Sequence, residues 1–237
     1  MSRRAIILAG GKGTRLRPYT TVLPKPLMPI GDYPILEVIV RQLAQSGFSH
    51  ITMAVNHQAH LIKAFFQDGQ QWNIKIDYSL EDIPLGTMGP LKLLENLPEN
   101  FLVMNGDVLT DLNFATFFDN HLKTSSIFTI ASMLREQVID YGVLDKDENN
   151  FLIGFREKPR QLFDVSMGVY ILNKAVLDFV PVNTVFGFDT LMIKFLKENK
   201  QVSIHSHSGY WMDIGRPDDY EKAIDEFEAM KNRFFNG

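Results

Sequence analysis

The segment with the clearest capacity for chemistry is a glycine-rich loop near the start of the chain. An apolar run ends at Ala9, and the sequence Gly-Gly-Lys-Gly-Thr-Arg follows at residues 10–15. Glycines let backbone N–H groups approach a phosphate closely, and successive amides can form an anion-binding nest. Arg15 adds a planar fork of donors, and Lys25, fixed between two prolines, adds a point charge. The segment therefore predicts a site for the phosphate groups of a ligand.

Two commoner phosphate motifs do not fit this loop. A P-loop requires Gly-Lys followed by Ser or Thr, whereas Gly13 follows Lys12. A dinucleotide fingerprint starting at Gly11 requires Gly or Ala where Leu16 stands. The glycine cluster alone is also compatible with an ordinary strand-to-helix turn. The spacing that continues through Pro29 favours the phosphate site.

Two aspartates stand in apolar surroundings where a functional carboxylate is expected. Asp107 follows the apolar strand expected at 101–104, and Asp213 lies within the apolar segment 211–215. Ligands of open α/β sheets lie beyond the carboxyl ends of the strands, which places Asp107 where chemistry is expected. Each residue also has a purely structural interpretation, because aspartate is common in turns and at helix N-caps.

The elements that must position these residues alternate between strands and helices. Strands are expected at 5–9, 51–55, 74–78 and 101–104, and helices at 35–45, 59–66, 90–97 and 113–123. Later strands are expected at 127–133, 142–145, 152–156, 165–172 and 202–205, with a hairpin turn at 145–150 and a last helix at 218–234. This alternation implies right-handed βαβ units. We expect an α/β fold: a three-layer, Rossmann-like arrangement with a mixed, mostly parallel sheet and helices on both faces.

Composition excludes several classes of function. The formal net charge of −4 argues against a general nucleic-acid or membrane binder. The absence of cysteine excludes disulfides and thiolate zinc sites. Because no apolar run is long enough to span a bilayer, we expect a cytoplasmic protein. A local positive field for an anionic ligand is expected from Arg3, Arg4, Lys12, Arg15, Arg17 and Lys25.

The glycine loop together with Pro24-Lys25-Pro26 resembles the N-terminal motif of the sugar nucleotidyltransferases, also called nucleotide-sugar pyrophosphorylases. The resemblance implies that Asp107 and Asp213 hold Mg²⁺, and that Arg15, Lys25 and Lys158 are catalytic. It covers the catalytic domain of that family, so we expect one domain over residues 1–237 without a C-terminal β-helix. It assigns nucleotide binding to Leu8, Gly10, Gly11, Gly13, Thr14, Glu81, Gly86 and Thr87.

The sugar-phosphate side of the resemblance rests on three further elements. The Glu-Lys-Pro triplet at 157–159, the Tyr-Gly pair at 141–142 and Ser-Met-Gly at 166–168 are all typical of the family. By this resemblance Glu157 accepts hydrogen bonds from sugar hydroxyls and Lys158 binds the 1-phosphate. Many guanylyl and thymidylyl members have Asn where Ser166 stands. The sugar-phosphate residues implied are Asn105, Gly142, Glu157, Lys158 and Ser166.

Residues 78–91 resemble the Leu-Gly-Thr-Ala-Gly element of mannose-1-phosphate and heptose-1-phosphate guanylyltransferases, with Met88 in place of the usual small residue. The resemblance implies that this segment lies against the nucleotide base. Glu81 could accept hydrogen bonds from the donor-rich edge of guanine. The alternative is that Glu81 is merely exposed at a strand end. His57, His60, His205 and His207 receive no catalytic role.

The activity implied is transfer of a nucleoside monophosphate from an NTP to a sugar 1-phosphate, with Mg²⁺ as cofactor and release of pyrophosphate. GTP with mannose-1-phosphate or a heptose-1-phosphate is the preferred pair, and thymidylyl, uridylyl or adenylyl transfer to glucose-1-phosphate is the alternative. A glycosyltransferase is disfavoured because Asp107-Val108-Leu109 lacks the Asp-x-Asp motif. A non-catalytic nucleotide-sugar binding protein is disfavoured by the presence of Arg15, Asp107 and Lys158. A homo-oligomer is compatible with the sequence.

Overall fold

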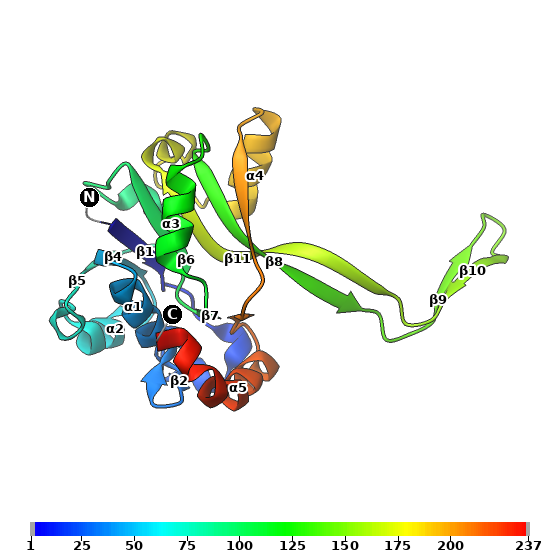
Figure 1. The fold of residues 1–237 in the computed structure, drawn as a ribbon, viewed down its shortest axis with the longest axis horizontal. Coiled ribbons are helices and arrows are strands. Elements are labelled where there is room, and N and C mark those ends of the chain that lie inside the picture. Colours follow the sequence, from blue (N-terminus) through cyan, green and yellow to red (C-terminus); the bar gives the residue numbers. More distant parts are fainter. Residues whose placement is uncertain (1–2, 236–237) are drawn as a thin grey trace.

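The computed structural model describes residues 3–235, which form a rounded body and a long projecting arm (Figure 1). A seven-stranded mixed sheet forms the centre of the body, in the order β12-β8-β11-β6-β1-β4-β5. Strand β11 is antiparallel to both of its neighbours, while the other paired strands of the sheet are parallel. The mixed, mostly parallel sheet expected from the sequence is confirmed. The seven strands are β1 (Arg3–Leu8), β4 (Phe48–Val55), β5 (Lys75–Leu80), β6 (Asn100–Asn105), β8 (Phe128–Val138), β11 (Arg160–Asn173) and β12 (Val202–His207).

Alternating side chains of the strands supply two apolar cores, one on each face of the sheet. In β1, Ala5 and Ile7 join one core and Ile6 joins the other, as the twofold repeat of a strand requires. The first core contains apolar side chains from α1 (Ile35–Gln45), α2 (Ala59–Phe66) and α3 (Phe114–Leu122). The second contains side chains from α4 (Phe188–Lys197). The predicted three layers are therefore present.

Helix bounds follow local signals in some places and tertiary contacts in others. Helix α1 begins and ends where the sequence predicted, and Asn113 caps α3 by accepting a hydrogen bond from the Thr116 N–H at 2.8 Å. The helix expected at 90–97 is wrong: only a 3₁₀ helix, η5 (Gly89–Leu93), forms there, and Leu94 is already extended. Helix α4 was not predicted. Short 3₁₀ segments η4 (Gln70–Trp72) and η6 (Lys174–Phe179) complete the connections.

The last helix, α5 (Pro217–Phe235), covers the segment that follows the glycine loop. This segment consists of η1 (Thr14–Leu16), η2 (Tyr19–Thr21), η3 (Lys25–Leu27), β2 (Pro29–Ile30) and β3 (Tyr33–Pro34). A third core joins the two: Leu16, Met28 and Ile30 are buried together with Phe227 and Phe234 of α5. The helix thereby fixes a loop that has little regular structure of its own. None of the helices described in residues 3–235 is long and apolar enough to cross a membrane.

A small two-stranded ribbon joins distant parts of the chain beside the main sheet. Strand β7 (Val108–Thr110) directly follows Asp107, and it pairs antiparallel with β13 (Trp211–Asp213). Asp213 stands opposite Val108, and the Ile214 N–H donates to the Asp107 carbonyl at 3.1 Å. Backbone pairing thus brings the two candidate metal ligands together across more than 100 residues of sequence.

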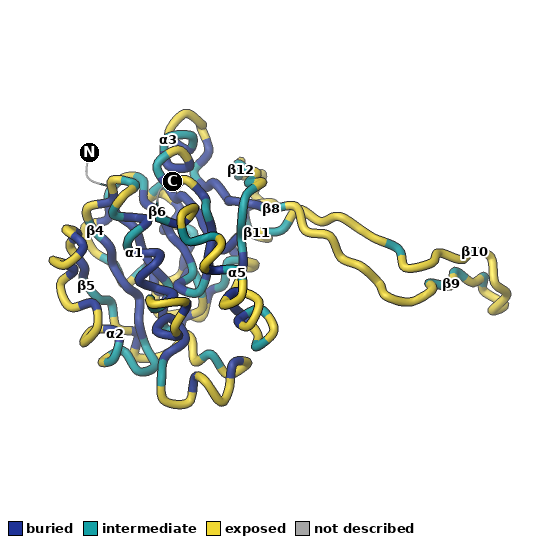
Figure 2. Tube along the Cα trace, turned by 60° about the horizontal axis from the view of Figure 1, so that its bottom comes forward, coloured by how far each residue is buried: buried dark blue, intermediate teal, exposed yellow. Residues whose placement is uncertain are grey.

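The arm, residues 134–165, is the continuation of β8 and β11 beyond the sheet. The two strands stay paired up to Val138 and Arg160, and a second hairpin of β9 (Val143–Lys146) and β10 (Leu152–Arg156) forms the tip. Figure 2 shows that exposed residues run along nearly its whole length, in contrast to the body. In the sequence, strands were expected at 142–145 and 152–156, but nothing there predicted that they would project from the body.

The third core predicts a large effect of truncating Phe227, which is 1 % exposed and stacks on Phe234 with ring centroids 5.6 Å apart. Phe227→Ala should lower the free energy of unfolding by about 3–5 kcal/mol, because it removes buried contacts and leaves a cavity. Urea denaturation followed by circular dichroism measures the change. Leu196→Ala, at an exposed position of α4, is the control and should change the value by less than about 0.5 kcal/mol. Equal effects of both substitutions would contradict the role given to α5.

Candidate active site

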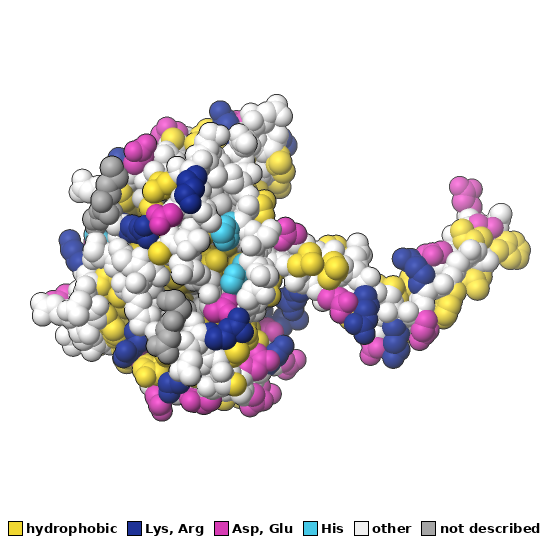
Figure 3. All heavy atoms as spheres, in the orientation of Figure 1, with side chains coloured by type: hydrophobic (Ala, Val, Ile, Leu, Met, Phe, Trp, Pro, Cys, Tyr) yellow, Lys and Arg dark blue, Asp and Glu magenta, His cyan; other side chains and the backbone are white. Residues whose placement is uncertain are grey.

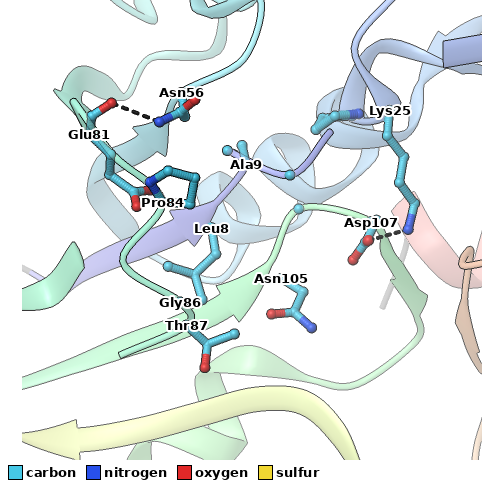
Figure 4. A pocket seen from close by; sticks show the side chains of 14 residues that line it. Leu8, Ala9, Lys25, Asn56, Glu81, Pro84, Gly86, Thr87, Asn105 and Asp107 are labelled. Atoms are coloured by element: carbon cyan, nitrogen blue, oxygen red, sulfur yellow. Dashed lines mark hydrogen bonds and ion pairs between the residues drawn. The ribbon is translucent and has the colours of Figure 1, made fainter. Parts of the chain in front are cut away.

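A cavity of about 330 Å³ opens at the edge of the sheet where the parallel strands β1, β4 and β6 end (Figure 4). This is the position that the fold rule for open α/β sheets assigns to ligands. Predicted site residues from four separate segments meet there. The cavity is lined by Leu8, Ala9, Gly10, Gly11, Lys25, Pro26, Asn56, Glu81, Pro84, Gly86, Thr87, Asn105, Gly106 and Asp107.

The glycines of the loop meet different steric demands. Gly13 has φ +59°, and a Cβ there would lie 2.9 Å from the Thr20 Cγ2 atom, so only glycine fits without strain. The Thr20 hydroxyl donates to the Gly13 carbonyl at 2.7 Å and holds the turn. A Cβ on Gly10 would lie 3.1 Å from Glu81 Oε1, whereas one on Gly11 would meet open space. Gly11 is the exposed, accessible member that a phosphate could approach.

Lys25 and Asp107 form an ion pair at the wall of the cavity, drawn in Figure 4. Lys25 is 9 % exposed and lies between two prolines. In η3, Leu27 packs into the first core, and Met28, which follows η3, packs into the third. The ammonium contacts Asp107 Oδ2. Asp107 Oδ1 is buried and accepts no hydrogen bond from any described residue. A buried carboxylate oxygen without a donor has the capacity to bind a cation.

Asp213 lies next to Asp107, as the β7–β13 pairing requires. Loss of solvation and then the charge of Asp107 raise the pKa of Asp213, while Lys25 and Arg15 lower it. A Cβ placed on Gly215 would lie 3.5 Å from Asp213 Oδ2 and 3.6 Å from Arg15 Nη2, so both side chains flank this glycine. Two adjacent carboxylates, one of which has a buried oxygen without a hydrogen-bond donor, fit a hard divalent cation. Among the described residues no third acidic or histidine ligand joins them.

Glu81 is buried rather than exposed at its strand end, which excludes the alternative weighed above. It is 8 % exposed, and burial raises its pKa. Its Oε2 accepts from the Leu85 N–H at 3.0 Å, and Asn56 Nδ2 donates to its backbone carbonyl at 2.7 Å. Oε1 faces Gly10. One carboxylate oxygen thus orders the loop, and the other remains for a ligand at the cavity.

The loop that carries Gly86 and Thr87 is anchored to the start of α4. Gly86 has φ +80°, and a Cβ there would lie 2.8 Å from the Phe186 carbonyl oxygen. Thr87 Oγ1 accepts from the Phe188 N–H at 2.8 Å, a donor that α4 leaves unpaired at its first residue. Thr87 therefore has a structural task at this site as well as a position in the cavity lining.

On the opposite wall, β11 brings the Ser-Met-Gly element against Asn105. Gly168 has φ +73°, and a Cβ there would lie only 2.6 Å from Asn105 Nδ2. The Gly168 N–H donates to Ser166 Oγ at 3.3 Å, and Ser166 Oγ donates to the Tyr170 hydroxyl at 3.2 Å. Ser166 does not line the cavity itself. It stands two residues before Gly168, the residue that lies against Asn105. Gly13, Thr14 and Arg15 likewise lie beside the cavity rather than in its wall.

Three residues of the expected sugar-phosphate side are not brought to the cavity within one copy of the chain. Gly142, Glu157 and Lys158 lie on the arm, which extends away from the body (Figures 1 and 2). Lys158 pairs with Asp140 at 3.1 Å, and both side chains are exposed. Phe155 packs over Gly142, where a Cβ would lie 2.7 Å from its ring. Their roles in sugar-phosphate binding stay predictions.

Two members of the expected positive field lie elsewhere. Arg3 pairs with Asp119 at 2.6 Å, and Arg4 bonds to Thr52 Oγ1 at 2.7 Å. Both stand at the beginning of β1, while the cavity lies at its end. Sequence proximity to the glycine loop was misleading, because a strand separates the two in space. Their task is structural.

Sequence reasoning also missed Asn56, which lines the cavity directly after β4. The rule that placed Asp107 beyond a strand end could have found Asn56, since it follows the apolar run 51–55. His207 and Asp111 form a separate contact, 2.8 Å from Nε2 to Oδ1, and Asp111 also accepts from the Tyr210 N–H at 2.6 Å. This cluster anchors the segment before β13, consistent with the absence of a catalytic role for His207.

The chain is similar to known proteins over most of its length. Residues 4–229 match the model of the nucleotidyl transferase family. Mannose-1-phosphate guanyltransferase of Candida albicans is 34 % identical over 226 residues, which cover 92 % of this chain and 62 % of that protein. UTP–glucose-1-phosphate uridylyltransferase of Synechocystis sp. is 34 % identical over 241 residues, covering 93 % of this chain and 62 % of that protein. The chain thus spans about three fifths of the length of these curated relatives.

Among solved structures, HddC from Yersinia pseudotuberculosis superimposes with a TM-score of 0.73 and 29 % identity, covering 95 % of this chain and 99 % of that one. A second structure of HddC was solved in complex with GMP-PN. Fold and site together define an α/β protein with a glycine-rich loop at the carboxyl end of β1 and an acidic pair, Asp107 and Asp213, close to it. The chain belongs to the nucleotidyl transferase family, which confirms the resemblance found in its motifs.

The dual contacts of Glu81 predict a stability effect that is independent of any ligand. Glu81→Ala leaves the buried Leu85 N–H without its acceptor and should lower the free energy of unfolding by about 1–3 kcal/mol. Glu81→Gln retains an acceptor oxygen and should cost less. Urea denaturation compares the two variants, with Asp82→Ala at the exposed neighbouring position as the control. If Glu81→Ala were as stable as Asp82→Ala, the Leu85 contact would not order the loop.

Proposed function

We propose that this protein transfers a nucleoside monophosphate from an NTP to a sugar 1-phosphate, giving a nucleotide sugar and pyrophosphate. The observation that carries the proposal is the meeting of the glycine loop and the Lys25–Asp107 pair at one cavity, with Asp213 beside Asp107. Anionic phosphates require backbone donors and cations, and a divalent ion requires the two carboxylates. The relatives named above carry the same kind of activity in their names.

The chain's own residues would position and neutralise the reacting groups. A phosphate oxygen of the sugar 1-phosphate attacks the α-phosphorus, a new P–O bond forms, and the bond to the bridging oxygen of the β-phosphate breaks. Pyrophosphate leaves with that oxygen and its electron pair. The nucleophile is already an anion, so no general base is required. Lys25 and Arg15 would stabilise negative charge on the α-phosphate and on the leaving pyrophosphate.

The carboxylates of Asp107 and Asp213 would hold Mg²⁺, since the unpaired Oδ1 of Asp107 and its neighbour offer two hard oxygen ligands. The ion would reduce the negative charge that keeps two phosphate groups apart. Lys158 would hold the sugar phosphate and Glu157 the sugar hydroxyls, as the family motif implies.

A cytoplasmic location, a single catalytic domain and assembly into a homo-oligomer stay predictions.

For the base we propose guanine. Glu81 is buried with one oxygen free toward Gly10, and guanine presents N1–H and N2–H₂ donors on one edge, whereas adenine presents an acceptor at N1. The guanyltransferase of Candida albicans and the complex of HddC with GMP-PN support this choice. The uridylyltransferase of Synechocystis sp. has the same identity, so transfer of UMP to glucose-1-phosphate is the alternative.

The experiment that tests the activity is pyrophosphate release with Mg²⁺, each common NTP being paired with mannose-1-phosphate, glucose-1-phosphate and a heptose-1-phosphate. We expect release with GTP and either mannose-1-phosphate or a heptose-1-phosphate. Release with UTP and glucose-1-phosphate would retain the reaction and overturn the assignment of Glu81 to guanine. No release with any pair would overturn the proposed function.

Asp107→Asn should reduce turnover about 100-fold or more, because the neutral amide loses the charge that balances both Lys25 and the cation. Steady-state pyrophosphate release measures the loss, and circular dichroism checks that the fold persists. Asp178→Asn, at an exposed position on η6, is the matched control and should leave turnover unchanged. Full activity of Asp107→Asn would remove this residue from the metal site.

A further inference from the structure

The arm carries an apolar surface that nothing in one copy of the chain covers. Eleven of its large apolar side chains are exposed, among them Phe155 at 59 % and Ile153 at 69 %. Figure 3 shows such side chains both at the tip and toward the root. An isolated two-stranded ribbon is only marginally stable in water, and exposed apolar patches of this kind mark interaction sites. The arm therefore requires a partner surface.

The body of the same copy does not provide this partner surface. The pairs between β8 and β11 run without a break from Ser132–Ser166, at the edge of the body, to Val138–Arg160. Figures 1 and 2 show the ribbon leading straight outward from the body in two different views. To return its tip to its own cavity, the ribbon would have to fold back on itself and break this ladder. The pairing holds the tip away from the site of the same copy.

The cavity lacks the groups that the arm displays. Lys25 is paired with Asp107, and Arg15 lies against Asp213, so the two cations nearest the acidic pair already face carboxylates. A reaction between two phosphate compounds requires further cations for the second one. A second hollow of about 190 Å³ adjoins Asp213, and Arg135 at the root of the arm and Lys222 of α5 line it together with Trp211. This side of the site is open to an incoming chain.

We propose that two copies of this chain exchange arms, so that Glu157 and Lys158 of each copy complete the sugar-phosphate side of the other copy's site. The inference rests on the proposed function for the roles of these two residues. A twofold axis makes the exchange reciprocal, and each copy gives and receives the same element. The apolar side chains of the tip, with Leu144 opposite Phe155, become buried against the second copy.

The first test needs no substrate. Sedimentation of the full chain at micromolar concentration should give a dimer. The double variant Leu144→Ser/Phe155→Ser should shift the dimer toward monomer, with the circular dichroism of the body unchanged. Leu196→Ser removes an equally exposed apolar side chain from α4 and should leave the dimer intact. A monomeric wild-type chain, or a dimer that the double variant does not weaken, would overturn the exchange.

The second test uses the site itself. Asp107→Asn lies on the body and Lys158→Ala on the arm, and each variant alone should be inactive. The two are co-expressed with different tags, and the mixed dimer is purified through both. With exchanged arms, one of its two sites is built from wild-type halves, so the mixed dimer should recover about half of the wild-type activity. With each arm serving its own copy, both sites carry a lesion and no activity returns, which would overturn the proposal.

A mixed dimer of Asp107→Asn with Lys25→Ala is the control. Both lesions lie on the body, so neither site can be wild-type in either arrangement. Recovery here would show that the activity of the test dimer does not come from pairing a wild-type body with a wild-type arm. If the wild-type chain shows no turnover with any substrate pair, the proposed function fails. The sedimentation test still decides whether the arm joins two copies. The two failures are therefore distinguishable.

Discussion

The level ends of three parallel strands are the constraint on which the rest of this structure depends. Strand β1 pairs with β4 and β6 in such a register that Leu8 lies beside Ala54 and Asn105. The turns that follow all three strands therefore start at the same height. The glycine loop, Asn56 and the Gly-Asp pair at 106–107 come together for this reason. A shift of one residue in any of these pairings would turn alternate side chains to the other face and disperse the site.

Charge balance gives this edge of the sheet its chemical character. The Lys25–Asp107 pair is largely shielded from water, and Asp213 and Arg15 lie close by. Taking a lysine out of water is costly unless a partner compensates its charge, so the pair stabilises the empty site. In the proposed function, phosphates and a divalent cation would supply the same two charges in a different arrangement. One set of partners would then replace the other without leaving a charge uncompensated.

Much of this arrangement could be predicted from the sequence, because it follows from local patterns. The apolar spacing of 35–45 and 59–66 gave the helix bounds, and the apolar run before Asp107 placed that residue correctly. The features that were missed depend on long-range contacts. The β7–β13 pairing and the anchoring of Thr87 to α4 involve residues about 100 positions apart. The projection of the arm depends on how far β8 and β11 remain paired. Residues 134–138 and 160–164 do not reveal this, because their polar and apolar residues follow no regular alternation.

The contacts that fix the cavity also determine when it can form. All fourteen lining residues precede position 108, so a ribosome would complete the lining early. Three contacts of the site still await later residues. Asn105 lacks its neighbour until Gly168 is made, and Thr87 lacks its hydrogen-bond donor until Phe188 is made. The acidic pair is complete only once Asp213 is made. Because domains begin to fold from the N-terminus during synthesis, the nascent chain passes through a stage with an open, unsupported pocket. The cavity therefore gains the last of these contacts only after Asp213 has been made.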